Sequence, residues 1–330
     1  MTASQRTLQI RTHAWPLKEP FAIARGVRDS ARVVIVELQQ GDAMGRGEAG
    51  GVAYHGETPE TMHAQLERVR DAVEGGCGRH DLLALLPPGG ARHAVDAALW
   101  DLEAKSSGLP AWQRAGIERW QPIASAVTIG MRDLVAYEVA ARERAGFPWL
   151  KVKVGADDPV PAIAAVRRGA PQARLIVDAN QAWTVEALKR HAAALAPFRI
   201  DLLEQPVPAG QDAALEHVDC PIALCADEAF STLADLPDIA RRYQFVNIKL
   251  DKAGGLTSAL ELASAAREAG LRLMVGCMLG GSVSIAPAAV LAQRCEVCDL
   301  DGPWLQARDW PHGVTYDGGL MQLPTPALWG

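Results

Sequence analysis

Residues 149–154 of the chain read WLKVKV, an apolar run that contains Lys151 and Lys153 and is bounded by Pro148 and Gly155. This pattern is typical of a β-strand, in which side chains alternate between two faces, so both lysines lie on the same face. Two ammonium groups on one face of a buried strand are costly unless anions lie opposite them. An edge strand whose lysines face solvent fits the same residues, so the rest of the chain has to decide between the two interpretations.

Apolar runs of similar length recur through the remainder of the chain, and amphipathic segments separate them. The eight runs lie at residues 123–130, 149–154, 174–180, 200–206, 222–228, 245–250, 271–278 and 297–302. Near-continuous apolar strands that alternate with helices indicate a parallel sheet covered on both faces. Eight such units predict an α/β fold built on a TIM-type barrel, which we assign to residues 123–303.

The N-terminal part has a different pattern. Alternating segments at 7–17, 31–39 and 45–49 predict an antiparallel meander, with a loop at 21–30. Helices are expected at 58–73, 80–86 and 91–105, the first opening with Thr58 as N-cap and a proline after it. Residues 45–50 match G-x-G-x-x-G, but no helix follows them, so we do not interpret the match as a dinucleotide site. We therefore predict an α+β domain at 1–122, completed by the Pro-, Gly- and Trp-rich tail at 304–330.

The composition limits the kinds of partner that the protein can have. The net charge is −6, which gives no reason to expect nucleic acid or anionic membranes as partners. No apolar run reaches the length of a membrane span, and the N-terminus shows no signal-peptide pattern. Six cysteines in 330 residues do not suggest a disulfide framework, so we expect a reduced, cytoplasmic protein.

Charged residues repeat at the ends of the predicted barrel strands. Asp178, Glu204 and Asp227 end three consecutive strands, Lys153 lies on the strand before them, and Lys249 ends the strand after them. The C-terminal ends of barrel strands meet at one mouth, where barrel enzymes carry their active sites. Three carboxylates together repel one another unless a cation joins them, and Mg²⁺ is the hard oxygen-seeking ion that needs few protein ligands. We therefore expect one Mg²⁺ per subunit at Asp178, Glu204 and Asp227.

Two lysines on either side of a metal-bound carboxylate favour proton transfer at the neighbouring carbon. One lysine would remove the proton and the other would return a proton to the opposite face. A lysine with a pKa of ~10.4 is a poor base at neutral pH, so we expect the metal ion and the ammonium group of Lys151 to lower it. No histidine ends a predicted strand, so the sequence offers no histidine base or metal ligand there.

The ordered set of motifs resembles the enolase superfamily, in its muconate lactonizing enzyme-like branch, over nearly the whole chain. The resemblance is carried by Lys151-Val-Lys153, Asp178-Ala-Asn180, Glu204-Gln-Pro206, Ala226-Asp227-Glu228, Asn247-Ile-Lys249 and Lys252-Ala-Gly-Gly255. It implies a modified TIM barrel of the (β/α)7β type with an α+β capping domain. It also implies Lys153 and Lys249 as the catalytic bases, the Mg²⁺ site named above, and Lys151 as a group that neutralises the substrate carboxylate.

Within that branch the chain is similar to the dipeptide epimerases. Asp299-Leu-Asp301 looks like the pair that binds the α-ammonium group of a dipeptide, although two aspartates at a strand end could also simply face solvent. Arg25, in the stretch 21–26, looks like the arginine that meets a glutamate side chain, and Cys277 belongs to a matching stretch at 276–279. The resemblance therefore implies a dipeptide as the small-molecule partner, most simply L-Ala-D/L-Glu from murein peptide recycling.

One position departs from the family, and two alternatives stay open. The family tends to carry a hydroxyl late on the first barrel strand, where this chain has Ala126 with Ser125 and Thr128 beside it, so the dipeptide preference is not settled.

Another reaction of the same scaffold, such as o-succinylbenzoate synthesis or cycloisomerisation, would use substrates without an ammonium group. A non-catalytic, ligand-binding barrel would need no base on each face. The oligomeric state stays open, a homo-oligomer included.

Overall fold

The N-terminal alternation of apolar and polar residues forms an antiparallel sheet in the computed structural model, which describes residues 6–23 and 26–330. Its strands, paired in this order, are β1 (Arg6–Ile23), β2 (Gly26–Gln40) and β3 (Ala43–Ala49). The prediction of a loop across 21–30 was wrong, because β1 and β2 continue into it and pair Phe21 with Arg28. The pairing register shifts between Pro16 and Phe21, a stretch whose prolines cannot donate ladder hydrogen bonds. Arg25 lies outside the described residues.

Helices follow the sheet in the chain, and three of them pack on it. The helices are α1 (Pro59–Arg68), α2 (Arg70–Glu74), α3 (Leu82–Leu85), α4 (Gly90–Ser107), α5 (Ala111–Arg114) and the 3-10 turn η1 (Ala53–His55), and the three that pack on the sheet are α1, α2 and α4. The Oγ1 of Thr58 accepts a hydrogen bond from the backbone of Thr61, so α1 begins at the predicted cap. α4 packs directly on β3: a Cβ added at Gly47 would lie 1.9 Å from the carbonyl oxygen of Ala94. Gly45 and Gly47 thus allow a close helix–strand contact.

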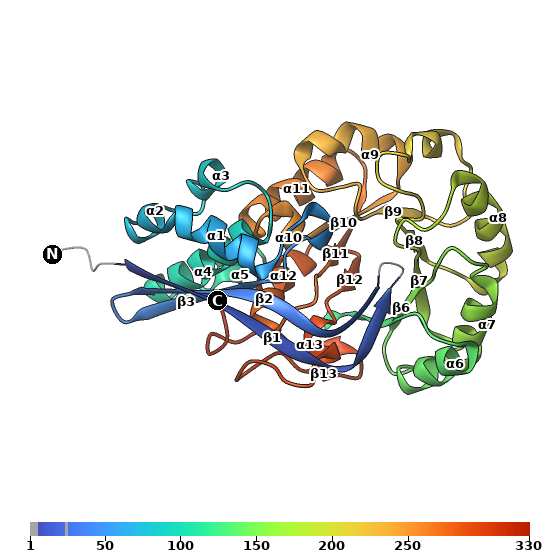
Figure 1. Ribbon diagram of the computed structural model, residues 1–330, viewed down its shortest axis with the longest axis horizontal. Helices are drawn as coiled ribbons and strands as arrows, with labels where there is room; N and C mark the ends of the chain where they lie inside the picture. Colours follow the sequence, from blue (N-terminus) through green and yellow to red (C-terminus); the bar gives the residue numbers. More distant parts are fainter. Residues whose placement is uncertain (1–5, 24–25) are drawn as a thin grey trace.

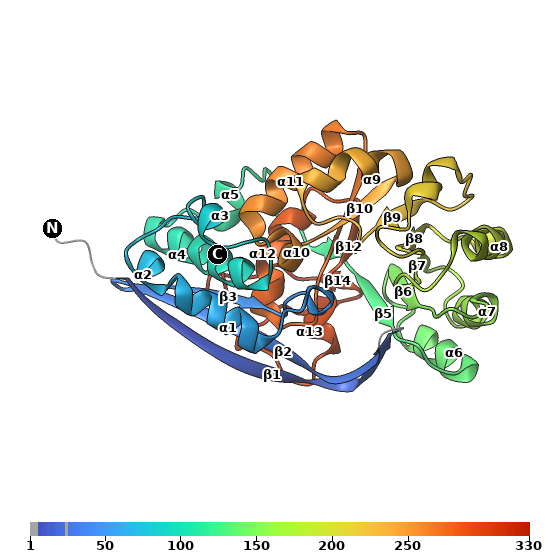
Figure 2. The same cartoon turned by 45° about the horizontal axis from the view of Figure 1, so that its top comes forward.

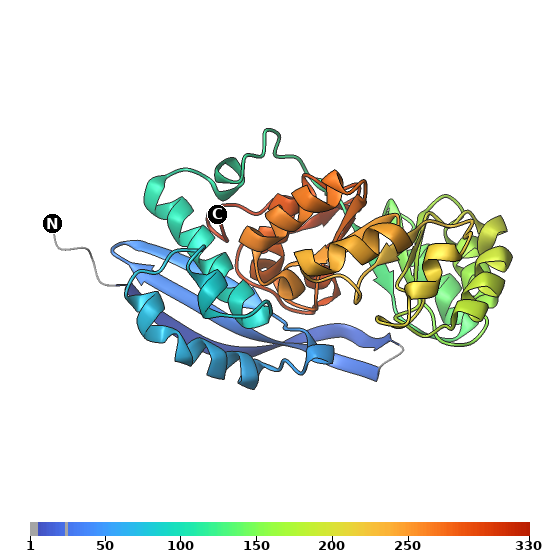
Figure 3. The ribbon, with the colours of Figure 1, turned by 90° about the horizontal axis from the view of Figure 1, so that it is seen from above.

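The predicted barrel is present as one eight-stranded parallel sheet with helices around it (Figures 1 and 3). In spatial order the strands are β5 (Ala126–Ile129), β6 (Trp149–Lys153), β7 (Arg174–Asp178), β8 (Leu202–Glu204), β9 (Leu224–Ala226), β10 (Phe245–Lys249), β11 (Arg272–Gly276) and β12 (Val297–Asp299). The connecting helices are α6 (Leu134–Glu143), α7 (Val160–Gly169), α8 (Val185–Leu195), α9 (Leu236–Arg242), α10 (Leu250–Ala253), α11 (Leu256–Glu268) and α12 (Ser282–Ala292), with 3-10 turns η2 (Ala196–Phe198), η3 (Ala213–His217) and η4 (Leu233–Asp235). Between β8 and β9 only η3 is present. The (β/α)7β-type fold is confirmed.

The two ends of the sheet meet through few backbone contacts. A single parallel bridge joins Ser125 to Cys298, and Ser125 Oγ accepts a hydrogen bond of 2.9 Å from the N–H of Leu300. The backbone N–H of Thr128 donates to Asp301 Oδ2 over 2.7 Å. The side chains of Ser125 and Asp301 therefore help to close the barrel, and Asp301 also lines the cavity at its mouth.

The C-terminal tail runs back over the molecule. It contains α13 (Gly302–Leu305), β13 (Tyr316–Asp317) and β14 (Leu320–Met321), the last of which pairs with β4 (Ile123–Ala124). At its end, Trp329 Nε1 donates to the carbonyl oxygen of Ala97 on α4. The tail thus contacts the N-terminal domain as well as the barrel. No helix in the described ranges is long and apolar enough to cross a bilayer.

The β1–β2 hairpin extends from the N-terminal sheet along the barrel, and its far end lies near β5 and β6 (Figure 2). The N–H of Met131, in the loop after β5, donates to the carbonyl oxygen of Ala22 over 2.9 Å. Glu19 accepts hydrogen bonds from Arg132 and Arg144 at 3.2 and 2.7 Å. These contacts hold the far half of the hairpin against the barrel mouth.

Candidate active site

The floor of the barrel is a ring of apolar side chains, one from each strand. Its members are Ala126, Trp149, Ile176, Leu202, Cys225, Phe245, Met274 and Val297, and they form one buried cluster. Because strand side chains alternate, the residue two positions further along each strand points into the barrel one layer higher. The strand phase therefore fixes which residues form the next layer.

That second layer is polar on seven of the eight strands, and the eighth contributes a glycine. It consists of Thr128, Lys151, Asp178, Glu204, Asp227, Asn247, Gly276 and Asp299. A Cβ at Gly276 would lie 2.7 Å from the side chain of Asn247, so the glycine makes room for that amide. Asn247 Nδ2 in turn donates to Glu204 Oε1 over 2.9 Å. A polar layer of this kind inside a barrel has to balance its own charges.

Lys151 is the central cation of this layer. Its Nζ lies 3.2 Å from Asp178 Oδ2, 2.8 Å from Glu204 Oε2 and 2.8 Å from Asp299 Oδ2. Burial alone would lower the pKa of Lys151, but the surrounding carboxylates, Asp299 foremost, raise it well above its ordinary value. The lysine is only 2% exposed, so the solvent-facing edge-strand interpretation of residues 149–154 is wrong.

Lys153 and Lys249 lie at opposite sides of the barrel, since β6 and β10 are the second and sixth of its eight strands. Lys153 Nζ is 2.5 Å from Asp178 Oδ2, and Lys249 Nζ is 2.7 Å from Asp227 Oδ2. Burial lowers the pKa of Lys249, but Asp227 outweighs this and the pKa is raised. A carboxylate lies against its ammonium group here, whereas the lowered lysine pKa expected from the sequence depends on a bound metal ion and stays a prediction.

The three carboxylates predicted to hold a metal ion end adjacent strands. Asp178, Glu204 and Asp227 are each at most 1% exposed. Burial and the neighbouring Asp178 raise the pKa of Glu204 to about 7. Burial also opposes ionisation of Asp178, but Lys153 and Lys151 hold its pKa at about 2. The pKa values of Asp178 and Glu204 differ this much because like charges that lie close together cannot all ionise equally easily.

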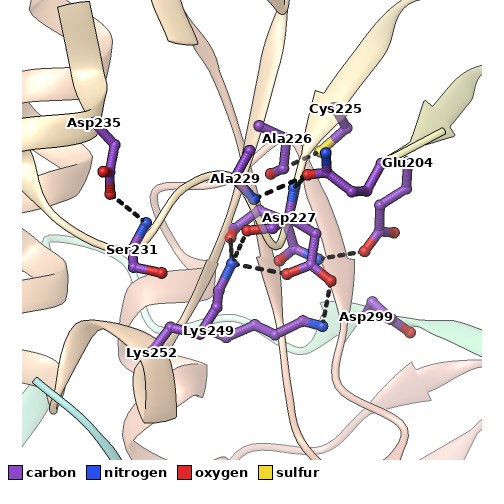
Figure 4. Close-up of polar contacts among 12 residues, drawn as sticks. Glu204, Cys225, Ala226, Asp227, Ala229, Ser231, Asp235, Lys249, Lys252 and Asp299 are labelled. Atoms are coloured by element: carbon purple, nitrogen blue, oxygen red, sulfur yellow. Dashed lines mark hydrogen bonds and ion pairs between the residues drawn. The ribbon is translucent and has the colours of Figure 1, made fainter. Parts of the chain in front are cut away.

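The fit of a metal ion to this cluster can be judged from its donor atoms. Across 6–23 and 26–330, no three acidic, histidine or cysteine side chains are already arranged to hold an ion. Lysine nitrogens take the positions between the carboxylates instead, as Figure 4 shows for Lys249 against Asp227. The set itself is all oxygen, buried and anionic. These donors fit a hard divalent cation such as Mg²⁺.

Asp299 and Asp301 form the acidic side of the mouth. Asp299 Oδ1 has no hydrogen-bond partner although the residue is only 4% exposed. Burial and the nearby Asp299 raise the pKa of Asp301 to about 7, while the hydrogen bonds from Thr128 oppose that shift. Neither aspartate faces open solvent, which removes the simplest alternative to a binding role.

A cavity of about 360 Å³ lies between the barrel mouth and the N-terminal domain, the size of a small-molecule site. Of the residues predicted from the sequence, its lining includes Lys151, Lys153, Lys249, Cys277, Asp299 and Asp301. The N-terminal domain contributes Phe21, Gly26, Val27, Arg28, Gly50, Gly51, Ala53 and Tyr54. Asp178, Glu204 and Asp227 are absent from the lining and lie behind the lysines.

The departure at Ala126 has a structural explanation. Ala126 belongs to the apolar floor, whereas Thr128, two residues further along β5, lines the cavity. Ser125 faces the closure with β12. The first strand therefore still provides a hydroxyl residue to the cavity. That residue is Thr128, which lies one layer above Ala126, the position where the family tends to carry a hydroxyl.

Several polar residues of the site were not assigned a role from the sequence. Lys252 Nζ donates to Asp227 Oδ1 over 2.7 Å (Figure 4) and also to the carbonyl oxygen of Asn247 over 3.1 Å. Gln205 Oε1 accepts a hydrogen bond from the backbone N–H of Asp227, and Asn180 lines the cavity. Asn247 could have been identified from the sequence, because it lies two residues after Phe245 on the same strand and therefore points into the barrel as well. Lys252 and Gln205 lie beyond the strands, where no periodicity predicts a direction.

Comparison with known families gives two matches that together span most of the chain. The N-terminal domain family of mandelate racemase / muconate lactonizing enzyme matches residues 5–116, and the enolase C-terminal domain-like family matches residues 134–327. Among curated relatives, the L-Ala-D/L-Glu epimerase of Escherichia coli (strain K12) is 41% identical over 96% of this chain and 100% of its own. An N-acetyl-D-glutamate racemase of Pseudoalteromonas sp is 42% identical over 76% of this chain and 79% of its own.

Solved structures agree with these matches. An enolase family member from Agrobacterium tumefaciens, described as homologous to dipeptide epimerases and holding sodium and L-Ala-L-Glu, superimposes with a TM-score of 0.96. It shares 42% identity and covers 98% of this chain and 100% of its own. A dipeptide epimerase from Enterococcus faecalis V583 with Mg and L-Leu-L-Tyr gives a TM-score of 0.89 at 29% identity, covering 98% and 97% of the two chains.

Proposed function

Because the chain belongs to the mandelate racemase / muconate lactonizing enzyme family of the enolase superfamily, we propose that it is a Mg²⁺-dependent dipeptide epimerase, an isomerase. The reaction inverts the α-carbon of the C-terminal residue by a 1,1-proton transfer. The observation that carries the proposal is the pair Lys153 and Lys249, whose ammonium groups face one cavity from strands on opposite sides of the barrel. A binding protein needs no base on each face of its ligand.

The proposed chemistry assigns each lysine one face of the substrate. In one direction Lys153 Nζ, as the free amine, takes the proton from the α-carbon, and Lys249 Nζ returns a proton from the other side. In the reverse direction the two exchange roles. Tyr137 supports this geometry, since its hydroxyl donates to the carbonyl oxygen of Lys153 over 2.7 Å. Inversion requires both bases, because one base would return the proton to the face from which it came.

The metal site proposed for this reaction consists of Asp178, Glu204 and Asp227. When bound, Mg²⁺ neutralises these carboxylates and stabilises negative charge on the substrate carboxylate. Lys151, which already lies among three carboxylates, neutralises the same region of the substrate from β6. The pKa of Lys249 is raised by the negative charge of Asp227. A bound Mg²⁺ would offset that charge, so the pKa of Lys249 would fall and the lysine could act as a base.

Charge at the cavity rim supports the choice of substrate. Asp299 and Asp301 lie on the β12 side and suit the α-ammonium group of a dipeptide, and Cys277 lies beside them in the lining. On the capping side, Arg28 lines the cavity and follows the predicted contact residue Arg25 by three positions. An arginine there suits an acidic side chain. L-Ala-D/L-Glu is therefore the proposed substrate, with murein peptide recycling in the cytoplasm as its setting.

Hydrogen exchange at the α-carbon tests this function. The protein is incubated with Mg²⁺ and L-Ala-L-Glu in D₂O, with a small panel of other dipeptides and N-acetyl-L-glutamate, which lacks the ammonium group. We expect deuterium at the glutamate α-carbon together with the D-epimer, and far less turnover of N-acetyl-L-glutamate. No deuterium incorporation into any dipeptide would contradict the proposal, and a preference for N-acetyl-L-glutamate would favour an N-acylamino acid racemase.

The two-base assignment is tested in the same assay with Lys153→Ala and Lys249→Ala. Each variant is expected to lose epimerisation by at least about 10³-fold, because one face then has no proton donor or acceptor. One variant can retain exchange of the proton on the face that its remaining lysine serves. Full epimerisation by either variant would contradict the mechanism.

A further inference from the structure

Gln205 follows Glu204 directly at the end of β8 and has no solvent exposure. It does not line the cavity, yet its side-chain amide makes four hydrogen bonds. Oε1 accepts from the backbone N–H groups of Asp227 and Ala229 at 2.9 and 3.1 Å. Nε2 donates to the carbonyl oxygen of Val207 at 3.0 Å and to the hydroxyl of Tyr243 at 3.1 Å. A carboxamide has two donors and two acceptor positions, so its capacity is fully used.

The backbone of Gln205 is equally constrained. Its φ of 34° lies in the left-handed region, which residues other than glycine seldom occupy. The N–H of Gln205 donates to the carbonyl oxygen of Cys225 over 2.9 Å, and its own carbonyl oxygen accepts from Gln181 over 2.8 Å. An unfavourable backbone conformation persists only where the surroundings fix it, and such residues concentrate at functional sites.

The network continues away from the site to an ion pair between Arg242 and Asp212. The Tyr243 hydroxyl donates to Asp212 Oδ2 over 2.9 Å, and Arg242 Nη1 donates to Asp212 Oδ1 over 3.1 Å. Tyr243 and Asp212 are each 2% exposed. The Nε2 atom of Gln205 is thus connected through Tyr243 to Asp212, and its Oε1 atom binds the backbone of Asp227.

The strands alone do not fix Asp227 relative to Glu204. The ladder between β8 and β9 ends with the pair Glu204–Cys225, two residues before Asp227. Beyond that point the side-chain amide of Gln205 makes the connection, because its Oε1 accepts from the backbone N–H groups of Asp227 and Ala229. We propose that Gln205 is a positioning residue that sets the spacing of the Glu204 and Asp227 carboxylates for Mg²⁺. This inference rests on the metal site of the proposed function.

Calorimetric titration of the full-length protein with Mg²⁺, without substrate, tests the inference. Gln205→Leu keeps the size of the side chain but removes all four hydrogen bonds, and we expect the Mg²⁺ dissociation constant to rise by about 10–100-fold. Tyr243→Phe removes a single hydroxyl, and we expect a rise of about 2–10-fold. In the exchange assay at saturating Mg²⁺, we expect kcat to fall in Gln205→Leu while KM for the dipeptide stays unchanged, because Gln205 does not contact the cavity.

Gln306→Leu is the matched control, since Gln306 is a glutamine 3% exposed whose side-chain atoms have no hydrogen-bond partner. It is expected to bind Mg²⁺ as the wild type does. Equal Mg²⁺ affinity of Gln205→Leu and Gln306→Leu would overturn the inference. If Gln205→Leu does not fold, unchanged affinity in Tyr243→Phe overturns it instead, as does a wild type that binds no Mg²⁺. A wild type that binds Mg²⁺ but turns over no dipeptide contradicts only the proposed function and leaves these comparisons intact.

Discussion

Lys249 and Lys252 are three residues apart and contact the same carboxylate from two sides. Lys249 faces the cavity from the end of β10, whereas Lys252, on α10, reaches back to Asp227 Oδ1 and is only 2% exposed. An ammonium group outside the cavity cannot serve as a base for the substrate. Its contact with Asp227 instead fixes that carboxylate and offsets its charge.

Replacement of Lys252 by methionine tests this structural role. The change keeps most of the side-chain volume but leaves the buried Asp227 without one of its two cationic partners. We expect the free energy of unfolding in metal-free buffer to fall by ~3 kcal/mol, the usual cost of breaking a buried ion pair. Urea denaturation followed by circular dichroism measures it. Lys189→Met, at an exposed position of α8, is the control and should change stability by less than ~0.5 kcal/mol; an equal effect of both changes would contradict the role.

At the scale of the elements, β12 has two functions that depend on one another. It carries Asp299 and Asp301 to the mouth, and it closes the barrel against β5 through the Ser125–Cys298 bridge. Ser125 Oγ accepts from the N–H of Leu300, the residue between the two aspartates. Without that bond, a buried donor loses its partner in the segment that has to hold both carboxylates.

Ser125→Ala therefore combines a loss of stability with a loss of substrate affinity. An unsatisfied buried N–H costs ~1–3 kcal/mol, and we expect the free energy of unfolding to fall by about that amount. KM for the dipeptide should rise as well, because Asp299 and Asp301 lose a fixed position. Urea denaturation and the exchange assay measure the two effects. Ser264→Ala, on the exposed face of α11, is the comparison; a Ser125→Ala protein that matches it in both measurements would argue against closure by Ser125.

At the scale of the whole molecule, the repeat made most of the architecture predictable. Each strand–helix unit returns the chain to the same mouth, so residues at strand ends, such as Asp178 and Glu204, could be brought together without a structure. The fold class and the family were confirmed on that basis. The domain boundaries at 122/123 and 303/304, and the roles of the site residues, stay predictions.

The features that could not be predicted depend on contacts across the barrel. Lys151 pairs with Asp299, 148 residues away, and that contact exists only because the first and last strands meet. The antiparallel pairing of 7–17 with 31–39 was predicted, but the extension of the β1–β2 hairpin through 21–30 was missed, and the contact of that extension with the mouth depends on the assembled barrel. The raised pKa of Lys249 follows from a carboxylate distance that no sequence spacing gives.

Glu48 connects three separate parts of the chain at the junction of the two domains. Its Oε1 accepts from the N–H of Gly281 at the start of α12 and from Trp15 Nε1, at 2.5 and 3.2 Å. Its Oε2 accepts from Trp310 Nε1 in the tail, at 2.5 Å. Burial raises the pKa of Glu48 from its ordinary value of 4.5 to about 7, although the hydrogen bonds from Trp310 and Gly281 favour the anion. The interface between the domains should therefore respond to pH.

The sign of that response follows from proton binding. Between pH 4.5 and 7 the folded protein binds a proton at Glu48 that the unfolded chain has released, so stability falls as pH rises through this window and the loss is complete above pH 7. The shift corresponds to at most ~3 kcal/mol. Glu48→Gln cannot titrate, so the unfolding free energy of the wild type minus that of the variant should decrease by up to this amount between pH 4.5 and 8, measured by urea denaturation. Glu67→Gln, on α1, is the control: hydrogen bonding to Arg70 lowers the pKa of Glu67, so its difference from the wild type should change only below pH 4.5. A wild-type minus Glu48→Gln difference that stays constant or grows from pH 4.5 to 8 would show that Glu48 is ionised throughout and that its three hydrogen bonds outweigh its burial.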